Sequence, residues 1–280
     1  MNRYTVIGQP IAHSLSPEIH ALFGELTQRR ISYTRTEASP EGFEEAVRAF
    51  QQAGGKGCNV TLPHKERALT VCDCLHASAE IAGAVNTIHM QRDGRLVGYN
   101  TDGKGLVADL SAGLQVPIEG RRILMLGAGG AARGVLGPLL ERAPAEIMLL
   151  NRTEEKARAL ADRFTEFGSI HALPCTADLA DLTPVDIVIN ATSMSLQGEV
   201  PSLDELTLDD DALVYDMMYA REDTPFVNWG KSRGVRAVHG YGMLVQQAAE
   251  SFFVWEGVRP KVRMARKRFA AILANSHFYR

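Results

Sequence analysis

The residues at positions 127–132 have the composition of a loop that binds a pyrophosphate. They read Gly-Ala-Gly-Gly-Ala-Ala and directly follow residues 122–126, an apolar run typical of a β-strand. Glycines allow the backbone to approach phosphate oxygens, and a helix start offers unpaired N–H groups and a positive dipole. Ala132 stands at the third glycine position, which helix–strand packing tolerates. The segment therefore predicts a dinucleotide site, although the same turn alone would be an ordinary tight turn of an α/β domain.

The residues after the next predicted strand indicate which dinucleotide binds. NAD-binding folds place Asp or Glu about 20 residues beyond the glycine loop, where it binds the ribose hydroxyls. This sequence has Asn151, Arg152 and Thr153 there, with Lys156 close behind. A guanidinium pairs with a 2′-phosphate and stacks on adenine, whereas a carboxylate would repel the phosphate. We therefore expect NADP; Asn151 and Thr153 can in addition cap a helix that begins at Glu154.

Three segments near the N-terminal end concentrate polar side chains in apolar surroundings. They are residues 13–16, 59–65 and 100–102. The two-residue period of a β-strand places Asn59 and Thr61 on one face and the apolar residues beside them on the other. Polar groups on a buried strand need partners. Since the glycine-loop half offers no suitably placed acid or base, we expect the chemistry to come partly from these segments.

Alternating strand and helix patterns surround the three polar segments. Strands are expected at residues 4–7, 31–36 and 57–61, and a hairpin at residues 85–90 and 96–99. Ser16 and Pro17 have the types of an N-cap and a first helical residue. Apolar residues recur at helical spacing over residues 43–50. The first hundred residues thus form one mixed α/β unit.

A second alternation begins after Gly120 and predicts a doubly wound parallel sheet. Its strands are expected at residues 122–126, 146–150, 185–190, 213–216 and 235–238. Two closing helices, residues 243–255 and 261–274, are expected to pack on the first unit. A chain of 280 residues exceeds the usual size of one domain, so two domains are expected.

The composition favours a globular protein that binds small molecules. Hydrophobic residues make up 45% and charged residues 22% of the chain. The formal net charge of −3 provides no basic surface for nucleic acid or an anionic membrane. Because no segment has the length of a signal sequence or membrane span, we expect a cytoplasmic protein. Cys58, Cys72, Cys74 and Cys175 lack metal-site spacing and are expected to be free thiols.

In order along nearly the whole chain, these segments resemble the signatures of the shikimate dehydrogenase family. The matching segments are residues 11–17, 59–65, 83–87, 100–102, 127–133, 151–153, 190–193, 216–219 and 242–249. The resemblance implies an NADP-dependent oxidoreductase of aromatic amino-acid biosynthesis that reduces 3-dehydroshikimate to shikimate. It also implies a discontinuous mixed α/β substrate domain, residues 1–103 completed by 241–280, around a Rossmann-type NADP-binding domain, residues 104–240.

The resemblance further implies roles for individual residues. The substrate carboxylate would be bound by Ser14 and Ser16 with Tyr219 nearby, although the two serines could also be simple helix caps. The ring hydroxyls would be held by Thr61, Asn86, Asp102 and Gln247. The nicotinamide side of the cofactor would contact Thr192, Ser193, Met217, Gly240 and Met243. The phosphates and adenosine would contact Gly127, Ala128, Gly129, Gly130, Ala131, Asn151, Arg152, Thr153 and Lys156.

Lys65 and Asp102 correspond to the catalytic pair of the family. Hydride transfer to the C3 carbonyl develops negative charge on oxygen, which an ammonium group can stabilise and protonate. The reverse reaction needs a proton acceptor instead. The division of proton transfer between the two side chains stays open. His64 is expected to support the residues that contact the substrate without contacting the substrate itself. His13 is expected to support the turn at Ser14.

Two alternative functions are weighed against this interpretation. One is a quinate/shikimate dehydrogenase that uses NAD, and residues 151–153 argue against it because they lack a carboxylate. The other is a non-catalytic NADP-binding sensor, and the joint presence of Ser16, Lys65, Asn86 and Asp102 argues against it. The expected partners are the small substrate and NADP, with no metal, nucleic acid or membrane, in a monomer or homodimer.

Overall fold

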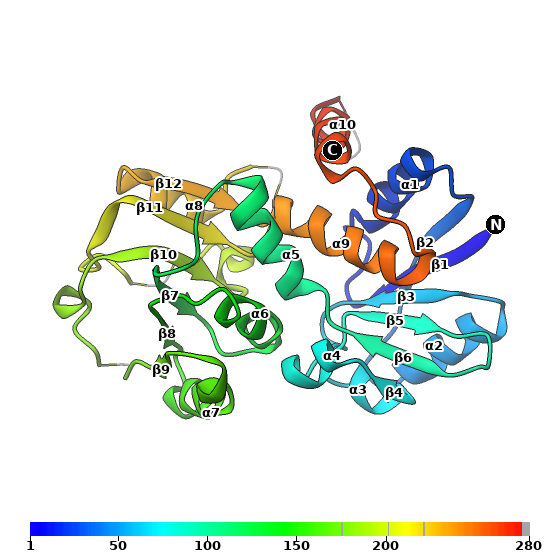
Figure 1. The fold of residues 1–280 in the computed structure, drawn as a ribbon, viewed down its shortest axis with the longest axis horizontal. Helices are drawn as coiled ribbons and strands as arrows, with labels where there is room; N and C mark the ends of the chain where they lie inside the picture. The colour runs from blue at the N-terminus through cyan, green and yellow to red at the C-terminus, as the bar shows by residue number, and fades with distance from the viewer. Residues whose placement is uncertain (175, 201, 221, 276–280) are drawn as a thin grey trace. The chain divides into compact units, whose positions relative to one another are not determined.

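The computed structural model describes residues 1–174, 176–200, 202–220 and 222–275 and divides into two compact units. Unit 1 comprises Met1–Gly105 and Val245–Arg280, and unit 2 comprises Leu106–Leu244. The chain passes between the units within two helical segments, which Figure 1 labels α5 and α9. Cys175, expected to be a free thiol, lies outside the described residues.

Unit 1 contains a mixed six-stranded sheet in the order β2-β1-β3-β5-β6-β4. Its strands are β1 (Asn2–Gly8), β2 (Ile31–Glu37), β3 (Gly57–Val60), β4 (Cys74–Leu75), β5 (Thr87–Met90) and β6 (Leu96–Tyr99). The first three strands run parallel, and the predicted hairpin pairs β5 with β6 in the antiparallel direction. The helices are α1 (Ser16–Thr27), α2 (Phe43–Gln52), α3 (Ala68–Val71), α4 (Ala77–Ala82), α5 (Asp102–Ala108), α9 (Tyr241–Glu256) and α10 (Val262–Asn275).

The two faces of β3 have different surroundings, as the alternation of its residues predicts. Cys58 and Val60 belong to an apolar cluster that includes Phe43 of α2. On the other face, Asn59 contacts polar groups that include Ser251 of α9. Gly57 permits this packing, because a Cβ there would lie 2.3 Å from the Trp255 indole nitrogen. The strand therefore separates an apolar core from a buried polar region.

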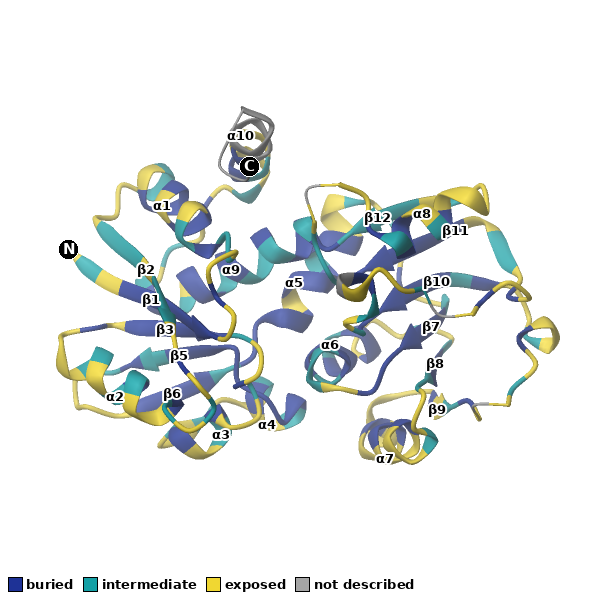
Figure 2. Ribbon diagram, turned by 180° about the vertical axis from the view of Figure 1, so that it is seen from behind, coloured by how far each residue is buried: buried dark blue, intermediate teal, exposed yellow. Residues whose placement is uncertain are grey.

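Unit 2 contains the predicted doubly wound sheet, in the order β12-β11-β10-β7-β8-β9, and each described pairing within it is parallel. Its strands are β7 (Arg122–Leu126), β8 (Glu146–Leu150), β9 (Ile170–Ala172), β10 (Val185–Asn190), β11 (Leu208–Asp216) and β12 (Arg236–His239). The α-helices are α6 (Gly130–Leu140), α7 (Glu154–Phe164) and α8 (Pro225–Ser232). Short π- and 3₁₀-helical segments are η1 (Asp109–Gly113), η2 (Thr165–Phe167), η3 (Leu179–Asp181) and η4 (Met194–Gln197). Figure 2 shows the central strands as predominantly buried.

The strand order of unit 2 reverses between β7 and β10. The chain continues from β7 to β8 and β9 on one side, and from β10 to β11 and β12 on the other. Dinucleotides bind at such a reversal, outside the carboxyl ends of the strands. The predicted glycine loop directly follows β7 and therefore lies at this point.

Several element boundaries differ from the prediction. Ser16 was expected to be the N-cap of α1, but Leu15 holds that position, because the Leu15 carbonyl accepts the first helical hydrogen bond from Ile19. Strand β9 was not predicted, since its short sequence has no clear alternation. Among the described helices, none combines the length and apolar character that crossing a membrane requires.

Candidate functional site

Lys65 and Asp102 meet in unit 1 as an ion pair. Lys65 lies in the loop between β3 and α3, and Asp102 is the first residue of α5. The Lys65 ammonium nitrogen lies 2.5 Å from Asp102 Oδ2. The Asp102 side chain is 7% exposed and that of Lys65 is 20% exposed. The two residues are 37 positions apart in the sequence, and the sheet brings their polar segments together.

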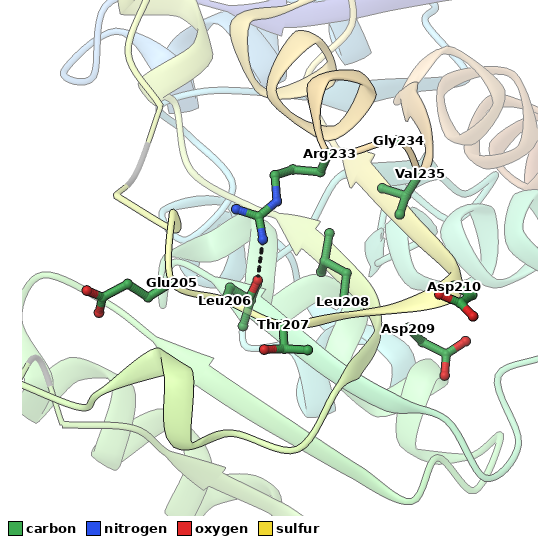
Figure 3. A pocket seen from close by; sticks show the side chains of 9 residues that line it. All are labelled: Glu205, Leu206, Thr207, Leu208, Asp209, Asp210, Arg233, Gly234 and Val235. Carbon is green, nitrogen blue, oxygen red and sulfur yellow. Dashed lines mark hydrogen bonds between the residues drawn. The ribbon is translucent and has the colours of Figure 1, made fainter.

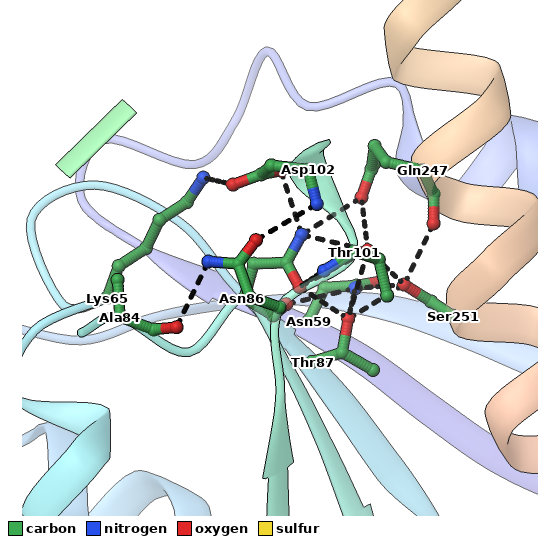
Figure 4. Close-up of polar contacts among 10 residues, drawn as sticks. Asn59, Lys65, Ala84, Asn86, Thr87, Thr101, Asp102, Gln247 and Ser251 are labelled. Carbon is green, nitrogen blue, oxygen red and sulfur yellow. Dashed lines mark hydrogen bonds and ion pairs between the residues drawn. The ribbon is translucent and has the colours of Figure 1, made fainter. Parts of the chain in front are cut away.

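Asn86 holds the other oxygen of the Asp102 carboxylate (Figure 4). The Asn86 amide nitrogen donates to Asp102 Oδ1 at 2.8 Å. Its amide oxygen accepts the Thr101 backbone N–H at 2.9 Å, which fixes the orientation of the amide because a peptide N–H can only donate. Asn100 accepts the backbone N–H of Asp102 at 3.0 Å and so caps the start of α5. The carboxylate is therefore held from two sides in one orientation.

A group of buried hydroxyls lies next to Asn86, and no sequence motif predicted this group. Ser251 Oγ lies 2.8 Å from the Thr87 hydroxyl and 3.2 Å from the Thr101 hydroxyl. Asn59 donates to the Ser251 hydroxyl at 3.0 Å and accepts from the Tyr33 phenol at 2.7 Å. Burial raises the pKa of Tyr33, so the phenol remains a donor. The one available sequence signal was that Ser251 follows Gln247 by one helical turn.

Gln247 of α9 completes the contacts around Asn86. Its side-chain oxygen accepts from the Asn86 amide nitrogen at 3.4 Å. Gly105 of α5 allows α9 to come this close, because a Cβ at Gly105 would lie 2.7 Å from Gln247 Cβ and 2.8 Å from its backbone nitrogen. Helices α5 and α9 thus carry Asp102 and Gln247 to the same group of side chains.

Ser14 and Ser16 form a second group before and at the start of α1. The Ser14 hydroxyl donates to Ser16 Oγ at 3.2 Å and accepts the Ser16 backbone N–H at 3.3 Å. Arg35 holds the turn by donating to the Ser14 carbonyl at 2.9 and 2.6 Å while it pairs with Glu18. The two serines thus bond to each other, but neither is the N-cap of α1, which is Leu15 and makes no side-chain capping hydrogen bond. Thr61 lies at the end of β3, with its backbone N–H bonded to the Ile7 carbonyl.

His64 packs into the apolar side of unit 1. Its ring stacks on Phe43 at 4.6 Å between centroids, and its Nε2 lies 2.9 Å from the Ala38 carbonyl. Burial lowers the pKa of His64, which favours the neutral ring. These contacts give His64 a structural role beside the neighbouring Lys65.

The glycine loop of unit 2 has the backbone geometry of a phosphate site. Gly127 has φ +102°, and a Cβ there would lie 2.9 Å from the Thr192 methyl group. Gly129 is the N-cap of α6 in an extended conformation that any residue could adopt, with nothing within 4 Å of a Cβ position. Neither backbone strain nor packing within the protein explains this second glycine. A bound pyrophosphate in the open space would explain it, so the residues present fit a dinucleotide.

The predicted adenosine end lies after β8. The Asn151 amide donates to the Thr153 carbonyl at 2.8 Å, and α7 begins at Glu154 as predicted. Thr153 is the N-cap, but its side chain makes no capping hydrogen bond in this described helix. Arg152, Thr153 and Lys156 are exposed. Exposed cations and a hydroxyl at this place suit a 2′-phosphate.

The predicted nicotinamide-side residues follow β10, β11 and β12. Thr192 is held by Asn190, whose side-chain oxygen accepts the Thr192 hydroxyl at 2.6 Å. Gly240 passes over the chain after β11, where a Cβ would lie 2.3 Å from the Met217 carbonyl oxygen. Met243 is buried in the first turn of α9. Ser193 and Tyr219 also lie in unit 2, in the loops after β10 and β11.

A surface pocket of unit 2 contains none of the predicted site residues (Figure 3). It lies between residues 205–210 and 233–235. Arg233 donates to the Leu206 carbonyl at 2.8 Å and to the Asp204 carbonyl at 2.6 Å. The other polar residues that line the pocket include Asp209 and Asp210, whose negative charge is unsuited to a nucleotide phosphate.

Comparison with known proteins assigns the chain to a family. Residues 6–88 match the family described as "Shikimate dehydrogenase substrate binding domain", and residues 111–197 match "Shikimate / quinate 5-dehydrogenase". A protein of Aeromonas salmonicida named "Shikimate dehydrogenase (NADP(+))" is 51% identical over 93% of this chain and 94% of its own length. The chain belongs to the shikimate dehydrogenase family.

A further relative and two solved structures are similar to this chain. An Alkalilimnicola ehrlichii protein of the same name is 50% identical, with 93% of this chain and 95% of its own length covered. The crystal structure of an Ael1 enzyme from Pseudomonas putida is 39% identical, with a TM-score of 0.85 over 96% of this chain and 98% of that one. The shikimate 5-dehydrogenase of Thermus thermophilus, crystallised with NADP(H) and shikimate, is 34% identical, with a TM-score of 0.84 over 96% and 99%. The two-domain shikimate dehydrogenase fold predicted from the sequence is thereby confirmed.

Proposed function

We propose that this family member is an NADP-dependent shikimate dehydrogenase that interconverts 3-dehydroshikimate and shikimate. The carrying observation is the Lys65–Asp102 pair held by Asn86 in unit 1, on a chain that also has the glycine loop of a dinucleotide site. The curated relatives at about half identity are named for this activity with NADP. Small soluble reactants are its partners, and it works in the cytoplasm as a monomer or homodimer.

Two domains divide most of the binding between them. Residues 1–103 with 241–280 form the substrate domain and residues 104–240 form the NADP-binding domain, with Tyr219 and Met243 as exceptions to this division. The serine pair Ser14 and Ser16, with Tyr219, binds the substrate carboxylate. The ring hydroxyls bind to Thr61, Asn86, Asp102 and Gln247. Such a set of hydrogen-bonding groups discriminates strongly against analogues that lack a hydroxyl, since a buried polar group would lose its partner.

Cofactor choice rests on the residues after β8. Arg152 and Lys156 supply positive charge to the 2′-phosphate, and Asn151 and Thr153 supply hydrogen-bonding groups. The glycine loop, with Gly127, Gly129 and Gly130 and the intervening alanines, accommodates the pyrophosphate. The residues after β10, β11 and β12 line the nicotinamide half.

Bound NADPH supplies the hydride that reduces the C3 carbonyl carbon of 3-dehydroshikimate. As the carbonyl bond pair moves to oxygen, the Lys65 ammonium stabilises the developing negative charge and donates a proton to that oxygen. Asp102 Oδ2 lies 2.5 Å from the ammonium nitrogen and keeps the ammonium group aligned. The two side chains share the proton transfer. In the direction of shikimate oxidation the same pair accepts the hydroxyl proton. Asn86 holds Asp102 in position throughout.

Initial rates of nicotinamide reduction test the proposal, with shikimate or quinate crossed against NADP⁺ or NAD⁺. Shikimate with NADP⁺ is expected to react fastest. Lys65→Ala should lower kcat by about 10²- to 10⁴-fold, the usual contribution of acid–base catalysis. Lys56→Ala is the matched control, because Lys56 is an exposed lysine before the opposite end of β3 and should leave the rate unchanged.

Other outcomes of the assay select other functions. Preference for quinate and NAD⁺ would identify a quinate/shikimate dehydrogenase. Tight NADP⁺ binding without turnover would identify a nucleotide sensor. An equal loss of rate in both lysine variants would remove Lys65 from the proposed chemistry.

A further inference from the structure

Asp216 is a fully buried carboxylate at the end of β11 that no step of the proposed reaction uses. Its Oδ1 accepts the Asn190 amide at 3.0 Å and the Met218 backbone N–H at 3.1 Å. Its Oδ2 accepts the Ser195 hydroxyl at 2.6 Å and the Thr224 hydroxyl at 2.7 Å. A buried carboxylate with such donors on both oxygens is fixed in position.

These donors come from separate segments of unit 2. Asn190 ends β10, Ser195 lies in η4, and Thr224 is the N-cap of α8. Asn190 in turn accepts the backbone N–H and the hydroxyl of Thr192 through its side-chain oxygen, at 3.0 and 2.6 Å. Asp216 therefore connects the loop that carries Thr192 with the loop that begins at Met217.

The position of these loops relative to a dinucleotide follows from the strand order. The glycine loop after β7 marks the pyrophosphate, and the residues after β8 mark the adenosine ribose. The other half of the dinucleotide must then extend to the opposite side of β7, over the ends of β10 and β11. Gly127 and Thr192 are in contact across this boundary, since a Cβ at Gly127 would lie 2.9 Å from the Thr192 methyl group.

We propose that Asp216 is a positioning residue for the nicotinamide half of the cofactor, which it serves by holding the loops after β10 and β11 in one arrangement. The inference rests on the proposed NADP-dependent function. It assigns to Asp216 no contact with the reacting atoms. Its effect reaches the cofactor through Asn190 and Thr192 and through the chain from Met217 onward.

Replacement of the carboxylate by an amide disturbs this arrangement specifically. In Asp216→Asn, an NH₂ group at the Oδ1 position would face an amide and a peptide N–H, which cannot accept a hydrogen bond. The amide must therefore turn its nitrogen toward Ser195 and Thr224, and both hydroxyls lose their acceptor. Loss of charge-assisted hydrogen bonds of this kind should weaken NADP⁺ binding by about tenfold or more.

The test compares two ligands by calorimetric titration of the full chain. NADP⁺ has a nicotinamide half, whereas adenosine 2′,5′-bisphosphate has only the adenosine half with the 2′-phosphate. In Asp216→Asn, the affinity for NADP⁺ should fall by about tenfold or more and the affinity for adenosine 2′,5′-bisphosphate should stay within about twofold. The KM for NADP⁺ should rise in parallel. Ser195→Ala, which removes one donor, should shift the same quantities by less.

Asp186→Asn is the matched control. Asp186 lies near the amino end of β10, where it accepts from the Arg121 guanidinium at 2.5 Å and from the Arg122 backbone N–H at 2.7 Å. It should lower thermal stability without separating the two affinities. Equal losses for both ligands in Asp216→Asn, or the same pattern in Asp186→Asn, would overturn the inference and leave the proposed function intact. Absence of NADP⁺ binding by the unmodified protein would instead overturn the proposed function.

Discussion

At the residue scale, hydrogen-bond direction explains how the candidate site is ordered. The Thr101 backbone N–H can only donate, so it fixes which end of the Asn86 amide faces the Asp102 carboxylate. The Asn86 backbone carbonyl fixes Asn59 in the same way, because it can only accept and the Asn59 amide nitrogen donates to it at 3.1 Å. Each amide is thus oriented by a group whose role is not reversible. An oriented site costs less reorganisation when substrate binds and when charge develops.

His20 gives a residue-scale prediction about pH. The ring is fully buried and stacks on Tyr33 at 4.3 Å between centroids. Burial lowers the pKa of His20 from 6.5 to about 3. Below pH 6.5 the unfolded chain therefore binds a proton that the folded chain excludes, and stability falls as the pH is lowered toward 3. The contribution is about 1.4 kcal/mol of unfolding free energy per pH unit over that window.

His20→Phe should remove this contribution because phenylalanine does not titrate. Urea unfolding at pH 7, 6, 5 and 4 would measure the difference in unfolding free energy between the variant and the unmodified protein. That difference should move in favour of the variant as the pH falls. A difference that is constant over pH would show that His20 does not exclude a proton in the folded state.

At the element scale, the approach of α5 to α9 determines where Gln247 lies. Helix α5 starts at Asp102, and α9 carries Gln247 and Ser251 to the same hydrogen-bonded group. Gly105 allows the short distance between the two helices, because a Cβ at this position would collide with the Gln247 backbone.

Gly105→Ala should therefore move Gln247 away from Asn86. We expect the KM for shikimate to rise by about 10-fold, corresponding to the loss of roughly one good hydrogen bond. Binding of NADP⁺ should change less, since the proposed phosphate and adenosine residues all belong to unit 2, whereas Gly105 and Gln247 belong to unit 1. Steady-state kinetics with each reactant varied in turn would distinguish the two effects. An unchanged KM for shikimate would mean that the close approach of the helices does not set the position of Gln247.

At the scale of the whole molecule, the proposed substrate and cofactor residues divide between two compact units. Apart from Tyr219, the proposed substrate residues lie in unit 1, and nearly all proposed cofactor residues lie after strands of unit 2. Each unit has its own sheet and its own buried apolar cluster. The proposed binding groups of each unit are therefore held largely by that unit's own packing.

This division predicts that each reactant binds without the other. Calorimetric titration of shikimate into the protein free of nucleotide should give saturable binding, as should titration of NADP⁺ without shikimate. Lys65→Ala should weaken the first interaction and leave the second unchanged. Shikimate binding that requires NADP⁺ would show that the residues of unit 1 alone do not make the substrate site.

Features that depend on local spacing could be predicted before the elements were placed in space. Strands β7, β8 and β10 have the predicted bounds, because apolar runs bordered by glycine or polar residues are buried in a parallel sheet. The alternation of β3 correctly separated Cys58 from Asn59. The order of the signature segments indicated the family that the comparisons confirmed.

Which groups meet, and in which orientation, depends on how the elements pack. Strand β5 lies between β3 and β6 in the mixed sheet, so the segments that follow β3 and β6 come close together. Lys65 and Asp102 form a pair for this reason, and no local sequence pattern specifies the distance between them. The contacts of Ser251 and Asp216 could not be predicted, because the partners of each come from distant segments. Periodicity specifies the face of an element on which a side chain lies. The donors and acceptors that it meets are specified only when the elements pack.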